Sequence, residues 1–172
     1  MTVKFDISNA RRTADFLRNI PKNLEVLQAR ARATLARRIA VEARRDIQTE
    51  YNLPAARVNE DISVRQTSEF VELVGKHRPI GRINFGGTQG NKGVTYQISK
   101  TGPRKTMSHS FIARGLSGNT QIFSRIGKPR LPIRAYYGPS VAQMLRKEGR
   151  PERLAELALA IFSTETDRLK KI

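Results

Sequence analysis

Cysteine is missing from this sequence, and so is any long apolar run. Without a single Cys among its 172 residues, the chain has neither disulfides nor thiolate chemistry, which fits assembly in a reducing cytoplasm. The first residues, MTVKFDISNARRTADF, lack the apolar core typical of a signal peptide. No uncharged stretch approaches the roughly 20 apolar residues that a membrane-spanning helix needs. We therefore expect a protein that does not enter a membrane.

Acidic residues are also missing, over a long central stretch. Between Glu72 and Glu148 the chain runs for 75 residues with 14 Lys and Arg and with neither Asp nor Glu. This stretch carries most of the net charge of +17, because the last 25 residues hold five charges of each sign. Cations that fold together repel one another unless something negative lies close by. One interpretation is a solvated basic surface that aids solubility; we expect instead a nucleic acid or an acidic protein as partner.

Segment 20–51 is predicted to be one long helix. Pro21 suits the first helical position, and apolar residues recur at spacings of three and four. This apolar stripe consists of Leu24, Leu27, Ala31, Leu35, Ile39, Ala43 and Ile47. Arginines occupy a different face, which is either a solvated side or a contact for a partner: they are Arg30, Arg37 and Arg44, flanked by Arg38 and Arg45.

Beyond Pro54 and one short turn or helical piece, the apolar period changes to two, which predicts strands. We place them in DISVRQT, EFVELVG, IGRINFG, VTYQI, SHSFIA, TQIFSR and LPIRA. RGLSGN is predicted to be a hairpin loop. GGTQGNKG, residues 86–93, is predicted to be a hairpin tip, because Lys92 is followed by Gly93 and not by the Ser or Thr of a phosphate-binding P-loop.

The chain returns to helix at its end. Ser140 and Gln143 have the spacing of a capping box, Gly149 stops this short helix, and Pro151 starts a second one. The inward residues are predicted to be Val141, Met144 and Leu145, then Leu154, Leu157, Ala158, Ile161, Phe162 and Leu169. We therefore predict a single α+β domain with a central antiparallel sheet of short strands. Its parts are an N-terminal extension 1–19, the long helix 20–51, a basic β region 60–137 and C-terminal helices 139–172.

Side chains that perform chemistry are sparse. His77 and His109 lie 32 residues apart with no Cys nearby, so we expect no zinc site. The basic region has no carboxylate to hold magnesium or to orient a base. We therefore expect no catalytic residue, no metal and no cofactor, and not an enzyme. Among the aromatic residues, Phe85, Phe111 and Phe123 are predicted to be core, whereas Tyr136 and Tyr137 are open to stacking on bases.

Residues 105–145, KTMSHSFIARGLSGNTQIFSRIGKPRLPIRAYYGPSVAQML, resemble the prophage minor tail protein Z family, the tail completion proteins of long-tailed phages. The helix and strands upstream agree with the same family, so the likeness covers most of 20–165. The matching features follow one another in the order Phe111-Ile112-Ala113, the Gly118 turn, Phe123 with Arg125-Ile126-Gly127, Leu131-Pro132-Ile133, and Gly138-Pro139-Ser140-Val141.

The resemblance implies a structural virion protein of a bacteriophage, assembled in the host cytoplasm. It would complete the head-proximal end of the tail as a homo-oligomeric ring at the neck, which we expect to have six copies. Its partners would be other tail and neck proteins, and it would contact packaged DNA or the head–tail joint. Two alternatives stay open: a free-standing nucleic-acid-binding protein without sequence preference, and a tail assembly factor absent from the mature virion.

These expectations select two sets of residues. The candidates for facing nucleic acid or the lumen of the ring are cations of the acid-free stretch: Lys92, Arg104, Lys105, Lys128 and Arg130. The candidates for a subunit interface are Arg125, Arg134, Tyr136 and Tyr137. Because proline restricts the backbone, we expect Pro129 and Pro132 to stiffen segment 128–137 into an extended rod. This rod is either a rim that carries cations or a plain connector.

Overall fold

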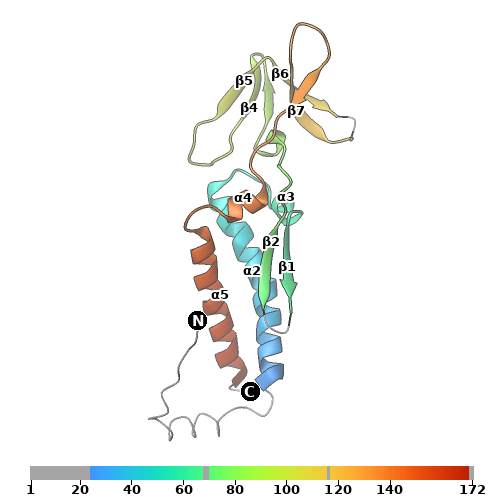
Figure 1. Ribbon diagram of the computed structural model, residues 1–172. Coiled ribbons are helices and arrows are strands. Elements are labelled where there is room, and N and C mark those ends of the chain that lie inside the picture. Colours follow the sequence, from blue (N-terminus) through green and yellow to red (C-terminus); the bar gives the residue numbers. More distant parts are fainter. Residues whose placement is uncertain (1–23, 68–69, 116, 171–172) are drawn as a thin grey trace, which may run out of the picture.

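The computed structural model describes residues 24–67, 70–115 and 117–170, and the extension 1–19 lies outside them. It confirms the α+β fold. Figure 1 shows an elongated molecule with two ends. One end, here called the helical half, consists of α2 (Leu24–Glu50), α5 (Arg150–Lys170) and the hairpin of β1 (Ile62–Gln66) and β2 (Val71–Gly75). The other end, the β half, holds the strands between residues 88 and 135.

In the helical half, α2 and α5 lie side by side and the β1–β2 hairpin packs on α2. The strands are antiparallel, with Val64 opposite Leu73. The predicted stripe of α2 is confirmed: Ile39 and Ala43 are buried against Leu154 of α5. Leu157 was predicted to face inward as well. That prediction was wrong, because Leu157 lies at the margin of the α5 stripe and is 37% exposed.

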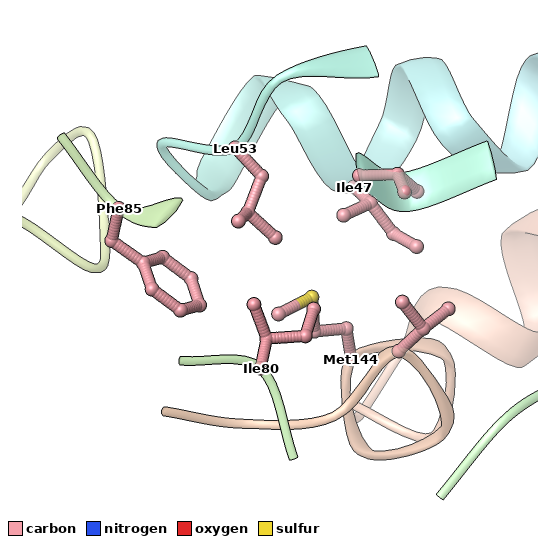
Figure 2. Close-up of a cluster of buried hydrophobic side chains, with 7 residues drawn as sticks. Ile47, Leu53, Ile80, Phe85 and Met144 are labelled. Carbon is pink, nitrogen blue, oxygen red and sulfur yellow. The ribbon is translucent and has the colours of Figure 1, made fainter. Parts of the chain in front are cut away.

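A junction of buried side chains joins the two halves. It brings together the end of α2, α3 (Ala55–Asn59), α4 (Val141–Leu145) and segment 80–85. Figure 2 shows Ile80 and Phe85 turned towards the same interior as Ile47, Leu53 and Met144. The predicted capping box is confirmed: the N–H of Gln143 donates to Ser140 Oγ over 3.2 Å, and the Gln143 side chain accepts from the Ser140 N–H over 2.9 Å.

The strand predicted in IGRINFG is wrong, because Arg82–Asn84 forms a 3₁₀ helix. The Asn84 N–H donates to the Gly81 carbonyl over 3.0 Å, and the Phe85 N–H donates to the Arg82 carbonyl over 3.1 Å. This tight turn places Ile80 and Phe85, five residues apart, in the junction core, where both are fully buried. An extended chain would point them in opposite directions, since side chains alternate along a strand.

The β half contains two three-stranded antiparallel sheets. One has the order β3 (Thr88–Gly90), β4 (Gly93–Tyr96), β5 (Lys105–Ser108), and the other β6 (Ser110–Arg114), β7 (Thr120–Arg125), β8 (Ile133–Ala135). Val94, Tyr96 and Ile122 form the core between the two sheets. The strands thus divide among three small sheets where we predicted one central sheet.

Two predictions within these sheets need correction. SHSFIA is not one strand: His109 has φ of 56°, and the chain leaves one sheet at Ser108 and enters the next at Ser110. Segment 128–137 is not a rod, because β8 pairs with β7 and residues 126–132 form the hairpin loop between them. The Ile126 N–H donates to the Pro132 carbonyl over 3.2 Å and closes this loop.

Candidate functional site

The ion pairs of the described residues lie outside the β half. The carboxylates that form ion pairs lie in the helical half and at the junction, between Glu42 and Asp61 and at Glu165. Among the described residues, no Lys or Arg from Arg82 to Arg146 has a carboxylate within 4.0 Å. The positive charge of the β half is therefore not neutralised within the described part of the chain.

Arg82 is one of the arginines that the fold itself uses. Its guanidinium donates to the Tyr96 hydroxyl over 2.7 Å and to the Tyr137 carbonyl over 2.9 Å. It also lies 5.0 Å from the centre of the Tyr96 ring and 5.6 Å from that of Tyr136. A cation over an aromatic face is attracted to the ring. Arg82 therefore ties the 3₁₀ turn to both sheets.

Two candidate residues also serve the fold. Arg104 donates from Nη2 to the Gly86 carbonyl over 3.2 Å and thereby holds the start of the β3 segment. Arg125 places its guanidinium 5.5 Å from the centre of the Phe111 ring. Neither contact uses all the donors of a guanidinium, which has five. Both side chains remain exposed and keep donors for a partner.

Several cations of the β half have no side-chain partner among the described residues. All are exposed, and because an ammonium or guanidinium is a strong donor, they are the groups most available to an anion. We call them the free cations: Lys92, Lys100, Lys105, Lys128, Arg130 and Arg134.

The strand register separates the candidate cations into two groups. Gly93 pairs with Ser108, and Ser110 pairs with Ser124 near the end of β7. Lys92, in the β3–β4 turn, therefore lies at the same end of the sheets as the β7–β8 loop with Lys128 and Arg130. This loop projects at the end of the molecule far from α2 and α5 (Figure 1).

The remaining candidate cations lie elsewhere. Lys105 pairs with Tyr96 at the opposite end of β5 from Ser108, and Arg104 precedes it. The structure thus brings together three of the five candidates, Lys92, Lys128 and Arg130, and places Arg104 and Lys105 apart from them.

The subunit-interface candidates also divide. Tyr136 is half-buried, its hydroxyl lies 2.9 Å from Ser124 Oγ, and it serves the fold as Arg125 does. Tyr137 is 50% exposed, and Arg134 is exposed on β8, the edge strand of its sheet. Tyr137 and Arg134 are therefore the accessible members of this set.

A groove beside β8 was not predicted from the sequence. It has a volume of about 1430 Å³, and its lining includes apolar side chains of the β7–β8 hairpin, three arginines and the carboxylate of Glu60. Leu131 is 67% exposed there and Ile133 is 38% exposed. Arg114 contributes positive charge, whereas Arg78 lies against the carboxylates of Glu60 and Asp61. The signal in the sequence was the pair of apolar residues flanking Pro132, which we had interpreted as part of a strand.

A smaller hollow lies at the far end of the β half. It has a volume of about 360 Å³ and lies between the β3–β4 turn and the corner where β5 passes into β6. Lys92 and His109 contribute to its wall. From the sequence, His109 was interpreted only as lacking the neighbours of a zinc site. Its role in this wall could not be predicted, because the corner is created by the pairing of two separate sheets.

Within the described ranges, no three His, Cys, Asp or Glu side chains gather as they would around a metal ion. None of the described helices has the length and apolarity to cross a bilayer. The candidate site thus consists of the free cations, the hollow and the groove.

Comparisons with family models, with curated proteins and with solved structures found no match to this chain.

Proposed function

We propose that this chain is a structural subunit of a phage tail, which completes the head-proximal end of the tail as a ring and contacts DNA or the head–tail joint there. The observation that carries the proposal is the segregation of charge. Free cations gather in a half of the molecule in which no described side chain neutralises them. The resemblance of residues 105–145 to tail completion proteins supports the same function.

The DNA contact requires no base recognition. Phosphates supply affinity that is independent of sequence, and each neutralised phosphate releases counterions. The free cations Lys92, Lys128 and Arg130 are exposed, lie at the same end of the sheets and have no partner to give up. They suit a surface that lies against the DNA backbone.

We expect the purified protein to bind duplex DNA without sequence preference and with an affinity that falls steeply as salt rises. Replacing Lys92, Lys128 and Arg130 together with Gln should flatten that dependence, because each lost phosphate contact reduces the slope of log K against log salt by about 0.9. Folding should be intact, since exposed charges contribute little to stability. Fluorescence anisotropy with duplexes of two unrelated sequences measures both effects.

The matched control removes three exposed arginines from the helical half, as Arg30→Gln, Arg38→Gln and Arg65→Gln. It changes the net charge by the same amount and should keep the salt dependence of the unmodified protein. If both triple variants lost the same amount of salt dependence in DNA binding, the result would contradict a β half that faces DNA. It would leave the excess charge as a general property of the surface.

For assembly, we propose that the groove of one copy receives the outer face of α5 of the next copy. Leu159 is 71% exposed on that face, and Glu152 and Glu156 are exposed at helical spacing from it. Neither glutamate forms an ion pair among the described residues. The groove offers the complement, with apolar Leu131 and the basic margin of Arg114. Two different surfaces that meet in this way close a ring when the rotation between copies permits it.

The contact predicts that Leu131→Ser and Leu159→Ser each abolish the ring without unfolding the subunit, since both side chains are largely exposed. Val26→Ser is the matched control, because Val26 is an apolar side chain of α2 that is 48% exposed. Light scattering and electron microscopy of the assembled protein give the number of copies, which we expect to be six. Particles that contain a single isolated copy, or a ring that survives both Ser variants, would refute this arrangement.

Two other functions make different predictions. A free-standing nucleic-acid-binding protein or a tail assembly factor would be absent from mature particles. Mass spectrometry of purified virions therefore separates both from a tail subunit, which must be present in them.

A further inference from the structure

We propose that the hollow between the β3–β4 turn and the β5–β6 corner is a phosphate-binding site, and that nucleic acid supplies the phosphate. The choice of nucleic acid rests on the proposed function, whereas the phosphate site itself does not. The hollow is lined by Gln89, Asn91, Lys92, Gly93, Ser108, His109 and Ser110.

Two of these side chains build the wall. Ser110 is 5% exposed, and its hydroxyl donates to the Met107 carbonyl over 2.6 Å and accepts from the Val94 N–H over 2.9 Å. The side-chain carbonyl of Gln89 accepts from the Ile112 N–H over 3.0 Å. These bonds join β4, β5 and β6 at one point. They hold the hollow in a fixed shape and leave the side chains of Gln89 and Ser110 largely occupied.

The other polar side chains of the wall are unoccupied. Asn91, Lys92, Ser108 and His109 are all exposed, and among the described residues none has a side-chain hydrogen bond or ion pair. Each can donate a hydrogen bond, and Lys92 can only donate. A wall of fixed geometry with free donors suits an anion.

The lining of the hollow carries positive charge because it contains no carboxylate. No Asp or Glu occurs in the chain between Glu72 and Glu148, so none of the lining residues is acidic. Lys92 therefore has no counter-charge within the wall. A phosphate meets no repulsion there and neutralises a cation that the fold leaves unpaired.

The backbone of His109 is the most unusual feature of the site. Its φ of 56° lies in the left-handed region, which non-glycine residues rarely adopt. Such strained conformations cluster at functional sites. Glycine would make the same corner without that strain. A histidine at this corner gains nothing for the fold from its side chain, which has no partner among the described residues, but it places an imidazole donor in the wall of the hollow.

The volume of the hollow favours a phosphate that belongs to a larger molecule. About 360 Å³ holds on the order of ten water molecules, each of which takes about 30 Å³, and so exceeds the needs of one phosphate group. Lys128 and Arg130, at the same end of the sheets, would contact the phosphates that follow along a strand. A phosphodiester backbone laid across this end of the molecule would use both.

The experiment is a titration of the full-length, isotopically labelled protein, followed by NMR. Inorganic phosphate is added in one arm, a short duplex DNA in a second, and sodium chloride of matched ionic strength in a third. We expect saturable shifts of the amide signals of residues 89–93 and 108–110 with phosphate and, at lower concentration, with the duplex. Sodium chloride should produce no saturable shift of these signals. Shifts with phosphate but none with duplex would overturn nucleic acid as the source, and no saturable shift in these residues would overturn the site.

Variants give a second test, which separates a role of Lys92 and His109 in binding phosphate from a role in stabilising the fold. Lys92→Gln and His109→Gly should each weaken phosphate binding by about tenfold, the typical loss for a hydrogen bond to a charged group. His109→Gly should at the same time leave the unfolding midpoint unchanged or raised, because glycine relieves the left-handed backbone. Lys100→Gln, an exposed lysine outside the hollow, should bind phosphate as the unmodified protein does. Equal binding by all three variants would overturn the site.

These results are separable from the proposed function. Ring formation by the same variants is measured by light scattering and does not involve the hollow. If the ring forms and the hollow binds no phosphate, the site is wrong and the subunit function stands. If the hollow binds phosphate and no ring forms, the phosphate site stands and the proposed ring subunit is wrong.

Discussion

Replacing Arg150 with methionine should lower the free energy of unfolding by about 3 kcal/mol, the low end of the range for breaking a buried ion pair. The side chain of Arg150 is only 2% exposed. It contacts Asp46 and the Met144 carbonyl, and it donates to Glu50 over 2.9 Å. We choose the low end because the Asp46 and Glu50 side chains are 26% and 24% exposed, so water partly replaces the lost partner. Denaturant unfolding followed by circular dichroism measures the effect.

Arg153→Met is the matched control. Arg153 contacts the same Asp46 over 3.3 Å, but its side chain is 58% exposed, and exposed ion pairs contribute at most about 1 kcal/mol. The two variants thus remove the same charge from neighbouring positions of α5. Similar losses in both would contradict the view that burial of Arg150 fixes α5 against α2.

The same cluster predicts how stability depends on pH. A hydrogen bond from Lys147, assisted by Arg150, lowers the pKa of Glu50 and outweighs the burial that would raise it. For Arg150 burial alone would lower the pKa, but the hydrogen bonds and charges of Asp46 and Glu50 raise it. A carboxyl with a lowered pKa in the folded state adds stability above its ordinary pKa and loses it as the pH falls through the folded value. The unmodified protein should therefore lose more stability than Arg150→Met between about pH 5 and pH 3.

Replacing Gly93 with alanine should destabilise the β half by about 3 kcal/mol. Gly93 has φ of +135°, and a Cβ there would lie 2.0 Å from the Met107 carbonyl oxygen. A strained backbone costs about 1–3 kcal/mol, and overpacking a site that cannot yield costs a similar amount. The obstruction is backbone of β5, the strand that pairs with β4 at this point. The variant therefore either separates the two strands or distorts the turn that carries Lys92.

Gly90→Ala separates this steric effect from the loss of a glycine as such. Gly90 belongs to the same hairpin, and a Cβ there would meet its nearest atom, the Gly93 carbonyl oxygen, at an ordinary 3.5 Å. Its free energy of unfolding should change by less than about 0.5 kcal/mol, as for most substitutions away from special positions. Amide hydrogen exchange would show whether the loss in Gly93→Ala is confined to β3, β4 and β5. If both variants unfold at the same denaturant concentration, the proposed clash is absent.

Features that depend on local sequence were predicted well. The helix predicted over 20–51 agrees with α2 from Leu24 to Glu50, and it is wrong at Tyr51, which forms a β-bridge with Ser99. The capping box at Ser140 has the predicted bonds. Both follow from spacings of three and four residues, which the helix itself imposes. The β1 and β2 strands were likewise found from their alternation. Features that depend on tertiary contacts were harder to predict. The segment from Ile80 to Phe85 has the apolar pattern of a strand, but packing of both side chains in the junction core is compatible with a 3₁₀ helix between them and not with a strand.

The positive charge of the candidate site could be predicted from the sequence, but the arrangement of its residues could not. The acid-free stretch is visible in the sequence, and the free cations do lie on it. The sequence does not show which cations the fold uses, because Arg104 and Lys105 are adjacent and yet only Arg104 holds a backbone carbonyl. It also gives no sign that Arg150 is buried, since a cation beside Pro151 at a helix start is usually exposed. The hollow was missed because its walls come from the β3–β4 turn and from the corner at which the chain passes from one sheet to the other.

The order of the elements along the chain has a consequence for synthesis. The apolar stripe of α2 is covered by α5, which begins about a hundred residues after α2 ends and follows every other described element along the chain. At the usual 5–20 residues per second, roughly 5–20 seconds separate the emergence of the two helices from the ribosome. Throughout that interval Ile39 and Ala43 have no α5 to pack against, whereas the strands of the β half, which have shorter connections, emerge within it. The nascent chain can therefore complete its β half before α5 has emerged to cover the apolar stripe of α2.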